Sequence, residues 1–474
     1  MLLPVTADRP WPLFDVATTR AIEREAASAL PPHGLMQRAG LAVARLALAV
    51  APHARTIWIA CGPGNNGGDG LEAAVHLHAW GRQVVLTLAG DPARLPPDAA
   101  MSWRQCRQAG LAPAARPPRE WDLCIDALLG IGGGRALQGE LAALVQAIHA
   151  GTGPVLAVDQ PSGLSSDTGT GESVRATHTL SLLTLKPGLF TALGRDRCGR
   201  VWFDDLGIAS DEARATAWLS GPPPAPVRPH ASHKGSYGDV AVVGGAAGMV
   251  GAAVLAASAA LHSGAGRVYL CPLAPVADAL VAGQPELMVR DIATLSLEQM
   301  AVACGCGAGE TVADVLPRVI DRARSLVLDA DALNAIAAQP QLAQALRRRT
   351  QPTVLTPHPL EAARLLAGTA AEVQADRLRA AATLAERFSC VVVLKGSGSV
   401  IAAPAKTPRL NPTGNARLAT AGTGDVLAGL VAALLAAGAE PFDAATAAAW
   451  RHGLAADRWP AGGALTAGAL AKTL

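Results

Sequence analysis

Residues 62–70 form a glycine-rich segment, GPGNNGGDG, whose polar side chains could bind a ligand. Its G-x-G-x-x-G spacing alone is a weak fingerprint of dinucleotide binding. Asp69 would place a carboxylate at the beginning of the following helix, where it repels a pyrophosphate. The segment is therefore not predicted to be an ordinary phosphate-binding loop, and Asn65 and Asn66 offer their amide groups to a different ligand.

Asn66, Asp126 and Ser162 carry hard oxygen atoms, the ligands that alkali and alkaline-earth cations prefer. We expect all three on loops at the same edge of a sheet. The set suits a weakly bound alkali cation better than zinc, and potassium is the predicted ion. Taken singly, Asn66 also fits a left-handed turn and Asp126 a loop cap.

Asp159 ends a predicted strand at 155–159, where a carboxylate could exchange a proton with a substrate. An aspartate two residues before Pro161 is, on its own, more often a turn cap. Lys186, in the LKPG segment at 185–188, could contact a cofactor phosphate, but a solvated loop lysine is an equal alternative. The predicted site therefore includes Asp159 and leaves out Lys186.

The segment 411–425, NPTGNARLATAGTGD, leads into an apolar helix that is predicted to begin near Val426. Small residues at 422–424 let successive backbone amides point at a transferring phosphoryl group, and Asp425 could accept the proton of an attacking hydroxyl. This arrangement is typical of ribokinase-like folds. The structural alternative is a glycine-rich helix N-terminus at which Asp425 only favours the helix dipole.

Hydrophobic periodicity predicts the elements that position these residues. In the first half, we expect helices at 35–50 and 71–80, and strands at 56–61, 83–88, 123–126 and 155–159. In the second half, we expect a helix at 252–262, and strands at 239–243, 267–271, 325–328, 353–355 and 390–394. Alternating strands and helices predict parallel α/β sheets, and ligands gather at the carboxyl ends of such strands.

The 474 residues exceed the size that a single hydrophobic core usually reaches, so two domains are expected. A proline-rich stretch at 220–238 breaks all periodicity and suits a spacer. We predict a Rossmann-like three-layer α/β domain over 1–215, a linker and entry segment over 216–237, and a ribokinase-like α/β domain over 225–474.

Charge and hydropathy exclude several classes of partner. The 40 basic and 38 acidic residues give a net charge of +2 without long runs of one sign, so no nucleic acid and no membrane surface is expected as a partner. The apolar stretches 246–261 and 426–439 are shorter than a bilayer-spanning helix. The N-terminus lacks the pattern of a signal peptide and the eight cysteines are scattered, which predicts reduced thiols and a cytoplasmic location.

Four segments of the first half together resemble the NAD(P)H-hydrate epimerase family, over roughly residues 15–210: GLMQRAG at 34–40, the 62–70 segment, DALLG at 126–130 and VDQPSG at 158–163. The resemblance implies potassium on Asn66, Asp126 and Ser162, and Asp159 is our candidate acid/base residue. The implied substrate contacts are Asn65, Asn66, Gly67, Gly68, Asp69, Gly130, Ile131, Gly132, Gly133, Gly134, Arg135, Ala136 and Asp159.

The second half resembles the ADP/ATP-dependent NAD(P)H-hydrate dehydratase family over roughly residues 225–474, through 411–425, VLDADALN at 327–334, TPHPLE at 356–361 and KGSGS at 395–399. The resemblance implies magnesium bound with ADP or ATP. The implied substrate contacts are Ala252, Gly307, His358 and Asp425, and the implied nucleotide contacts are Lys395, Gly396, Ser397, Gly398, Ser399 and Gly424. A strand-end His or Asp is, on its own, usually a cap.

Together the two resemblances predict a bifunctional enzyme that epimerises the R and S hydrates of NAD(P)H and dehydrates the S form with ADP or ATP. The chain departs from the family at 305–309, GCGAG, where Pro and Leu usually stand between the glycines, and at 416–418, ARL, where Gly-Met is usual. The alternative is a vitamin or sugar kinase of the ribokinase superfamily with a non-catalytic N-terminal binding domain. We also expect a homo-oligomer.

Overall fold

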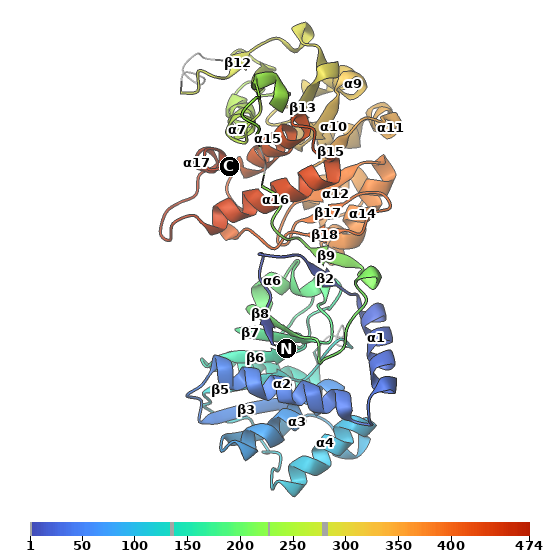
Figure 1. Cartoon of the computed structure of the whole chain (residues 1–474), viewed down its shortest axis with the longest axis vertical. Helices are drawn as coiled ribbons and strands as arrows, with labels where there is room; N and C mark the ends of the chain where they lie inside the picture. The colour runs from blue at the N-terminus through green and yellow to red at the C-terminus, as the bar shows by residue number, and fades with distance from the viewer. Residues whose placement is uncertain (1, 133–136, 226–227, 277–282) are drawn as a thin grey trace. The chain divides into compact units, whose positions relative to one another are not determined.

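The chain divides into two units in the computed structural model, which describes residues 2–132, 137–225, 228–276 and 283–474 (Figure 1). The N-terminal unit contains the chain up to Thr6 and Trp11–Trp218, and the C-terminal unit contains Ala7–Pro10 and Leu219–Leu474. The predicted linker segment contains a short strand, β9 (Ala217–Leu219), and a 3-10 helix, η4 (Lys234–Tyr237).

The N-terminal unit contains a seven-stranded sheet in the order β1-β8-β7-β6-β5-β3-β4. Every neighbouring pair is parallel except β1 and β8. The strands are β1 (Leu3–Pro4), β3 (Thr56–Cys61), β4 (Gln83–Leu88), β5 (Leu123–Ala127), β6 (Val155–Val158), β7 (His178–Leu182) and β8 (Arg200–Asp204), and the short strand β2 spans Trp11–Leu13. The helices are α1 (Val16–Ala29), α2 (Gly34–Val50), α3 (Asn65–Ala79), α4 (Pro97–Gln108), α5 (Gly139–Ala150) and α6 (Gly194–Arg197).

Strand β3 shows why this sheet is covered on both faces. Ile57 and Ile59 belong to one hydrophobic cluster, which also holds the apolar side chains of α2 and α3. Trp58 and Ala60, which point to the opposite face, belong to a second cluster with α5. A strand that is apolar on both sides requires helices on both sides, and the predicted three-layer α/β class is confirmed.

Helices α3 and α15 begin three or more residues earlier than predicted. Helix α3 begins at Asn65, although the sequence predicted a glycine-rich loop and a helix only over 71–80. Glycine has a low helix propensity, which is why no helix was predicted over 65–70. The packing of this segment nevertheless requires glycine, because a methyl group on Gly67 would lie 1.9 Å from the carbonyl oxygen of Gly62. Helix α15 likewise begins at Thr423, before the predicted start near Val426.

The C-terminal unit contains a sheet in which β12-β11-β10-β13-β14-β15-β16 are parallel and β17 and β18 continue it antiparallel. The strands are β10 (Asp239–Gly244), β11 (Arg267–Pro272), β12 (Met288–Val289), β13 (Met300–Cys304), β14 (Ser325–Leu328), β15 (Thr353–Leu355), β16 (Val391–Leu394), β17 (Val400–Ala402) and β18 (Arg409–Leu410).

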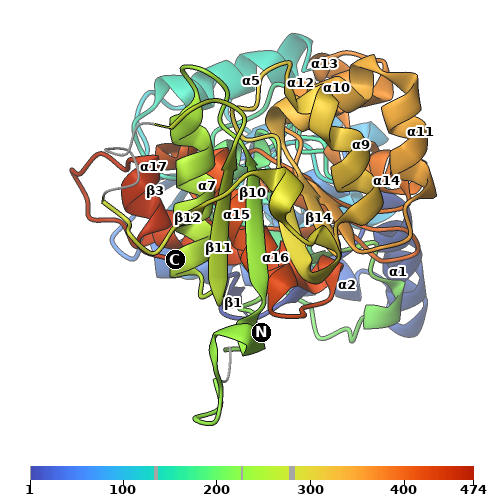
Figure 2. The same cartoon turned by 90° about the horizontal axis from the view of Figure 1, so that it is seen from above.

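Helices cover both faces of this second sheet. They are α7 (Val250–His262), α9 (Val312–Arg322), α10 (Ala330–Ala338), α11 (Pro340–Arg348), α12 (Pro359–Leu366), α13 (Ala370–Ala375), α14 (Arg377–Phe388), α15 (Thr423–Ala436), α16 (Pro441–Asp457) and α17 (Ala467–Ala471). Figure 2 shows β10 and β11 between α7 on one side and α9 and α11 on the other. Val240 and Val242 pack with α7, α15 and α16, whereas Ala241 and Val243 pack with the opposite layer, which confirms the α/β class here too.

Among the helices of the described residues, none is long and apolar enough to cross a membrane.

Candidate active sites

A cavity opens in the N-terminal unit at the carboxyl ends of β5, β6 and β7, beside α1, α2 and α3. This is the edge of a parallel sheet at which ligands are expected. Among the lining residues are the predicted contacts Asn65, Asn66, Asp69, Gly130, Ile131 and Asp159. The others are Thr19, Glu23, Leu35, Met36, Ala39, Asp98, Leu182, Leu183, Lys186 and Leu206, which were not predicted.

Some predicted contacts do not line this cavity. Gly67 and Gly68 are buried in the packing of α3, and a methyl group on Gly68 would lie 2.6 Å from the Met36 side chain. Gly132 is exposed and is not a lining residue. The predicted contacts Gly133, Gly134, Arg135 and Ala136 lie outside the described residues.

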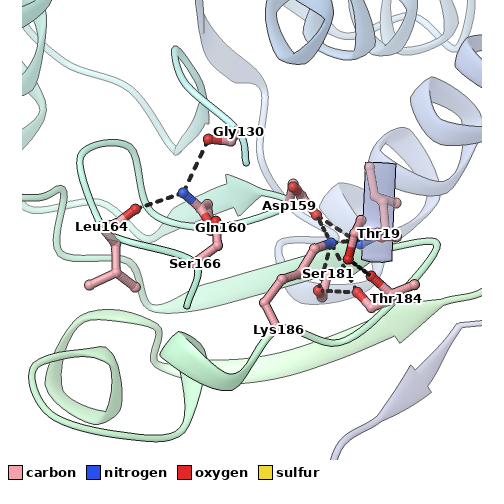
Figure 3. Close-up of polar contacts among 10 residues, drawn as sticks. Thr19, Gly130, Asp159, Gln160, Leu164, Ser166, Ser181, Thr184 and Lys186 are labelled. Atoms are coloured by element: carbon pink, nitrogen blue, oxygen red, sulfur yellow. Dashed lines mark hydrogen bonds and ion pairs between the residues drawn. The ribbon is translucent and has the colours of Figure 1, made fainter. Parts of the chain in front are cut away.

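Asp159 follows β6 and adopts a left-handed backbone conformation, with φ +66°, which non-glycine residues seldom do. Its carboxylate forms an ion pair with the ammonium of Lys186 (Figure 3). The same ammonium donates hydrogen bonds of 2.9 Å to the backbone carbonyls of Leu182 and Thr184. Lys186 is only 1% exposed, so its interpretation as a solvated loop lysine is wrong. Strained backbone that is held by buried contacts is a common feature of functional sites.

Asp126 and Ser162 are both buried and form hydrogen bonds with each other. The Ser162 hydroxyl donates to Asp126 Oδ1 at 2.6 Å, and the Ser162 amide donates to Oδ2 at 2.8 Å. Burial raises the pKa of Asp126 to about 6, although the bonds from Ser162 lower it. The Asn66 side chain, in the first turn of α3, lies next to the loop after β5, because a methyl group on Gly130 would lie 3.0 Å from its Oδ1. The Asn66 Nδ2 is buried and has no hydrogen-bond partner among the described residues.

Three further acids, Glu23, Asp69 and Asp98, line the cavity, and the first two have a raised pKa. Glu23, on α1, is half-buried, and burial together with Asp159 raises the pKa of its carboxyl group. Burial, Asp159 and Glu23 raise the pKa of Asp69 well above its usual range. The cavity therefore holds one carboxylate with a lysine counter-charge and two carboxyl groups whose ionised form is disfavoured.

In the C-terminal unit, Asp425 lies in the first turn of α15, which follows Gly422 in the left-handed conformation. The side-chain ligand atoms of Asp425, Asp329 and Cys306 all lie within 4.8 Å of one another. Burial and the neighbouring Asp329 raise the pKa of Asp425 to about 6, and a hydrogen bond with the Cys306 thiol lowers it. A carboxylate in this position can serve as a general base near neutral pH.

Lys395 joins this cluster from the loop after β16. Its ammonium lies 2.6 Å from Asp329 Oδ1, which also accepts a 2.7 Å hydrogen bond from the Thr356 hydroxyl. A methyl group on Gly424 would lie 3.2 Å from Lys395 Nζ. Burial lowers the pKa of Lys395, but the carboxylates of Asp329 and Glu361 outweigh it and leave the pKa raised. Two predicted nucleotide contacts, Lys395 and Gly424, are thus brought together beside Asp425.

The remaining predicted substrate contacts lie in three other segments: Ala252 in α7, Gly307 after β13 and His358 at the N-terminus of α12. A methyl group on Gly307 would lie 2.8 Å from the Ala252 side chain, so these two predicted contacts are adjacent. His358 caps α12, accepting hydrogen bonds at Nδ1 from the backbone amides of Leu360 and Glu361. The structural alternative for this histidine, a helix cap, is confirmed.

The 395–399 loop, with the predicted contacts Gly396, Ser397, Gly398 and Ser399, is supported by a residue that the sequence did not indicate. Arg377 is 1% exposed and donates 3.2 Å hydrogen bonds to the carbonyls of Leu394 and Lys395. Burial lowers its pKa to about 10. An arginine in the first turn of a helix usually faces solvent, so its sequence position carried no signal.

The chain is similar to known proteins along most of its length. Residues 240–474 match the family model of NAD(P)H-hydrate dehydratase, and residues 32–188 match that of the YjeF-related protein N-terminus. The bifunctional NAD(P)H-hydrate repair enzyme Nnr of Escherichia coli is 37% identical, covering 92% of this chain and 87% of the relative. The chain belongs to this family of bifunctional NAD(P)H-hydrate repair enzymes.

Two further similarities concern about half of the chain. The ADP-dependent (S)-NAD(P)H-hydrate dehydratase of Neisseria meningitidis is 45% identical, covering 51% of this chain and 83% of the relative. A solved structure of the ADP/ATP-dependent NAD(P)H-hydrate dehydratase from Bacillus subtilis, co-crystallised with ATP and Mg²⁺, is 33% identical, covers 52% of this chain and 91% of that chain, and has a TM-score of 0.46. The predicted membership of the NAD(P)H-hydrate repair enzymes is confirmed.

Cys306 lies in the 305–309 segment, where the sequence departs from the pattern that the family resemblance implies. Burial raises the pKa of its thiol well above the ordinary value, as do the carboxylates of Asp425 and Asp329. The thiol is therefore protonated and donates its hydrogen bond to Asp425. In this chain, the departure from the family pattern adds a polar contact to the candidate base.

Proposed function

We propose that the chain repairs hydrated nicotinamide cofactors. The N-terminal unit epimerises the R and S forms of NAD(P)H hydrate, and the C-terminal unit dehydrates the S form to NAD(P)H. The second reaction consumes ADP or ATP and releases phosphate with AMP or ADP. The observation that carries this proposal is the similarity to the repair enzymes across both units, and a cluster of carboxyl and lysine side chains in each unit supports it. That similarity favours repair over the vitamin or sugar kinase that the second site alone would suggest.

In the N-terminal site, Asp159 is the candidate acid/base residue. The substrate carries its hydroxyl on a ring carbon next to nitrogen, so inversion at that carbon requires proton transfer at the hydroxyl oxygen. Asp159 lines the cavity, and Lys186 gives its carboxylate a buried counter-charge. The amide groups of Asn65 and Asn66 line the same cavity and would orient the ring.

Potassium fits the cluster of Asn66, Asp126 and Ser162. The Asp126 carboxylate is fully buried, and among the described residues no lysine or arginine lies within ion-pair distance of it. A buried carboxylate without a counter-ion is costly, and a weakly hydrated monovalent cation would neutralise it. The oxygens of Asn66, Asp126 and Ser162 would hold the ion, which would order the loops around the cavity.

In the C-terminal site, phosphorylation would turn a poor leaving group into a good one. Asp425 would accept the proton of the substrate hydroxyl as that oxygen attacks the terminal phosphorus of the nucleotide. Lys395 and the backbone amide of Gly424 would face the transferring phosphoryl group. Magnesium would arrive with the nucleotide and neutralise its phosphates. The ring nitrogen would then expel phosphate and form an iminium, and loss of a proton from the adjacent ring carbon would restore the reduced nicotinamide.

The eight cysteines are all buried free thiols, which supports a reducing compartment, and we propose the cytoplasm.

The experiment that tests the function measures the recovery of reduced-cofactor absorbance from both hydrate epimers with nucleotide and magnesium. We expect full recovery by the wild type and none by Asp425→Ala, with Asp321→Ala as a matched control, because Asp321 is a largely exposed carboxylate of the same unit. Asp159→Ala should abolish epimerisation but leave dehydration of the S form intact. No recovery by the wild type with either ADP or ATP would reject the proposal.

A further inference from the structure

We propose that Glu23 is a second catalytic residue of the N-terminal site, exchanging a proton with the substrate hydroxyl from a different wall of the cavity than Asp159. This inference deepens the proposed epimerase function and rests on it. Glu23 belongs to α1, which lies outside the matched family region 32–188. The sequence did not single it out.

Helix α1 is fixed so that one of its faces borders the cavity. The Asp15 carboxylate caps its N-terminus by accepting a 2.8 Å hydrogen bond from the Thr18 amide. The buried Thr19 hydroxyl lies 2.8 Å from that of Thr184, in the same loop as Lys186. Glu23 is one turn beyond Thr19 on the same helix face, and both residues line the cavity. The contact at Thr19 therefore places Glu23 beside the Asp159–Lys186 pair.

The Glu23 carboxyl group makes no hydrogen bond or ion pair with another described residue, although it is half-buried. The charged and titratable groups that face it are Asp159, Lys186 and Asp69 across the cavity and Arg20 and Arg24 on its own helix. Burial and Asp159 raise its pKa despite the cations. A polar group that is partly withdrawn from water without a partner is available to a ligand.

The two carboxyl groups have unlike surroundings, which suits them to opposite tasks. Asp159 is held by an ammonium, whereas Glu23 has no bonded cation and the carboxylate of Asp159 as a neighbour. One residue can accept a proton while the other donates one. In a reversible reaction, one such group can act as the general acid when water leaves, and the other as the general base when water adds.

The balanced reaction uses each group once. Glu23 donates its proton to the hydroxyl oxygen, the carbon–oxygen bond breaks with its electron pair leaving on water, and the ring nitrogen forms a double bond to the carbon. Water then adds to the opposite face of that carbon and gives its extra proton to Asp159. The net change is inversion, with one proton moved from Glu23 to Asp159, and solvent returns it before the next turnover.

The test follows the interconversion of separated R and S hydrates without nucleotide, so that dehydration cannot occur, and subtracts the uncatalysed rate. Glu23→Gln should lower kcat by about 10²-fold with little change in KM, as expected for loss of a general acid. The wild-type rate should fall at high pH as Glu23 ionises, and the residual rate of Glu23→Gln should not show this fall. Glu23→Asp should recover part of the rate.

Glu25→Gln is the matched control on the same helix, because Glu25 is exposed and pairs with Arg214 at 2.7 Å. Melting temperature reports whether each variant folds, and dehydration of the S form should be unchanged in all of them. A Glu23→Gln enzyme with the wild-type rate overturns the inference, as does a slower enzyme whose pH profile is unaltered. A wild type that does not accelerate interconversion overturns the proposed epimerase itself.

Discussion

The buried pair of Asp159 and Lys186 predicts a specific loss of stability when the lysine is replaced. Lys186→Met keeps the length of the side chain but removes its charge. It leaves the Asp159 carboxylate, which is 8% exposed, without a counter-charge. It also leaves the carbonyls of Leu182 and Thr184 without the donor that each now has at 2.9 Å.

Removing one partner of a buried ion pair lowers the free energy of unfolding by about 3–5 kcal/mol. We take this range to include the cost of the two carbonyls that lose their donor. A unit of roughly 200 residues loses about 2–4 °C of melting temperature per kcal/mol, so we expect a fall of about 10 °C. Asp159→Asn in the Lys186→Met background removes the uncompensated charge. The double variant should therefore regain about 2 kcal/mol relative to additivity.

Scanning calorimetry of the full chain measures this loss, with the transition of the C-terminal unit as the internal reference. Arg214→Met is the control, because it breaks a solvent-accessible ion pair in the same unit and should cost less than about 1 kcal/mol. The reasoning is refuted if Lys186→Met and Arg214→Met have the same melting temperature. It is also refuted if the effects of Lys186→Met and Asp159→Asn on stability are simply additive.

Three other substitutions test single contacts. Ser162→Ala removes the 2.6 Å hydrogen bond to Asp126 and one of the proposed potassium ligands, so half-maximal epimerisation should need more K⁺. A rate independent of K⁺ would contradict the proposed ion. Cys306→Ala removes the thiol bond that lowers the pKa of Asp425, so the acid limb of the dehydration rate should move to higher pH, and an unmoved limb would contradict the bond. Gly67→Ala should lower the melting temperature by several degrees, because overpacking typically costs about 1–3 kcal/mol, and an unchanged melt would show that α3 can shift.

Local patterns in the sequence were sufficient for the sheets and for the loops at their edges. The apolar run in β3, the acid near the end of β5 and the acid after β6 placed Asp126 and Asp159 correctly at the carboxyl ends of parallel strands. Such signals work because a strand covered on both faces must be apolar throughout, and a polar residue then marks its end.

Contacts between segments distant in sequence could not be predicted in this way. Lys186 pairs with a carboxylate 27 residues earlier, and its burial depends on how the loop after β7 folds back. Glu23 reaches the cavity only because α1 is tied to that loop. Arg377 supports the Lys395 loop from a helix start that looks exposed in sequence. Side chains of this kind are usually solvated, so residue type and spacing gave no reason to place any of the three in a site.

The two sites repeat one electrostatic arrangement on unrelated sequences. In each, a lysine pairs with a buried carboxylate, Lys186 with Asp159 in the N-terminal unit and Lys395 with Asp329 in the C-terminal unit. Each pair lies near another carboxyl group whose pKa is raised. In each site, burial and the neighbouring paired carboxyl group both raise the pKa of the second acid.

The raised pKa values of Asp425 and Glu23 predict that the two reactions lose rate at opposite ends of the pH range. Asp425, with a pKa of about 6, must be ionised to act as a base, so dehydration should fall as the pH drops through about 6. Glu23 must be protonated to act as an acid, so epimerisation should fall as the pH rises through its raised pKa. Cofactor recovery from the R form needs both steps and should be limited by dehydration at low pH and by epimerisation at high pH. Separate pH profiles of the two reactions test this, and two profiles that fall on the same side would contradict the assigned proton directions.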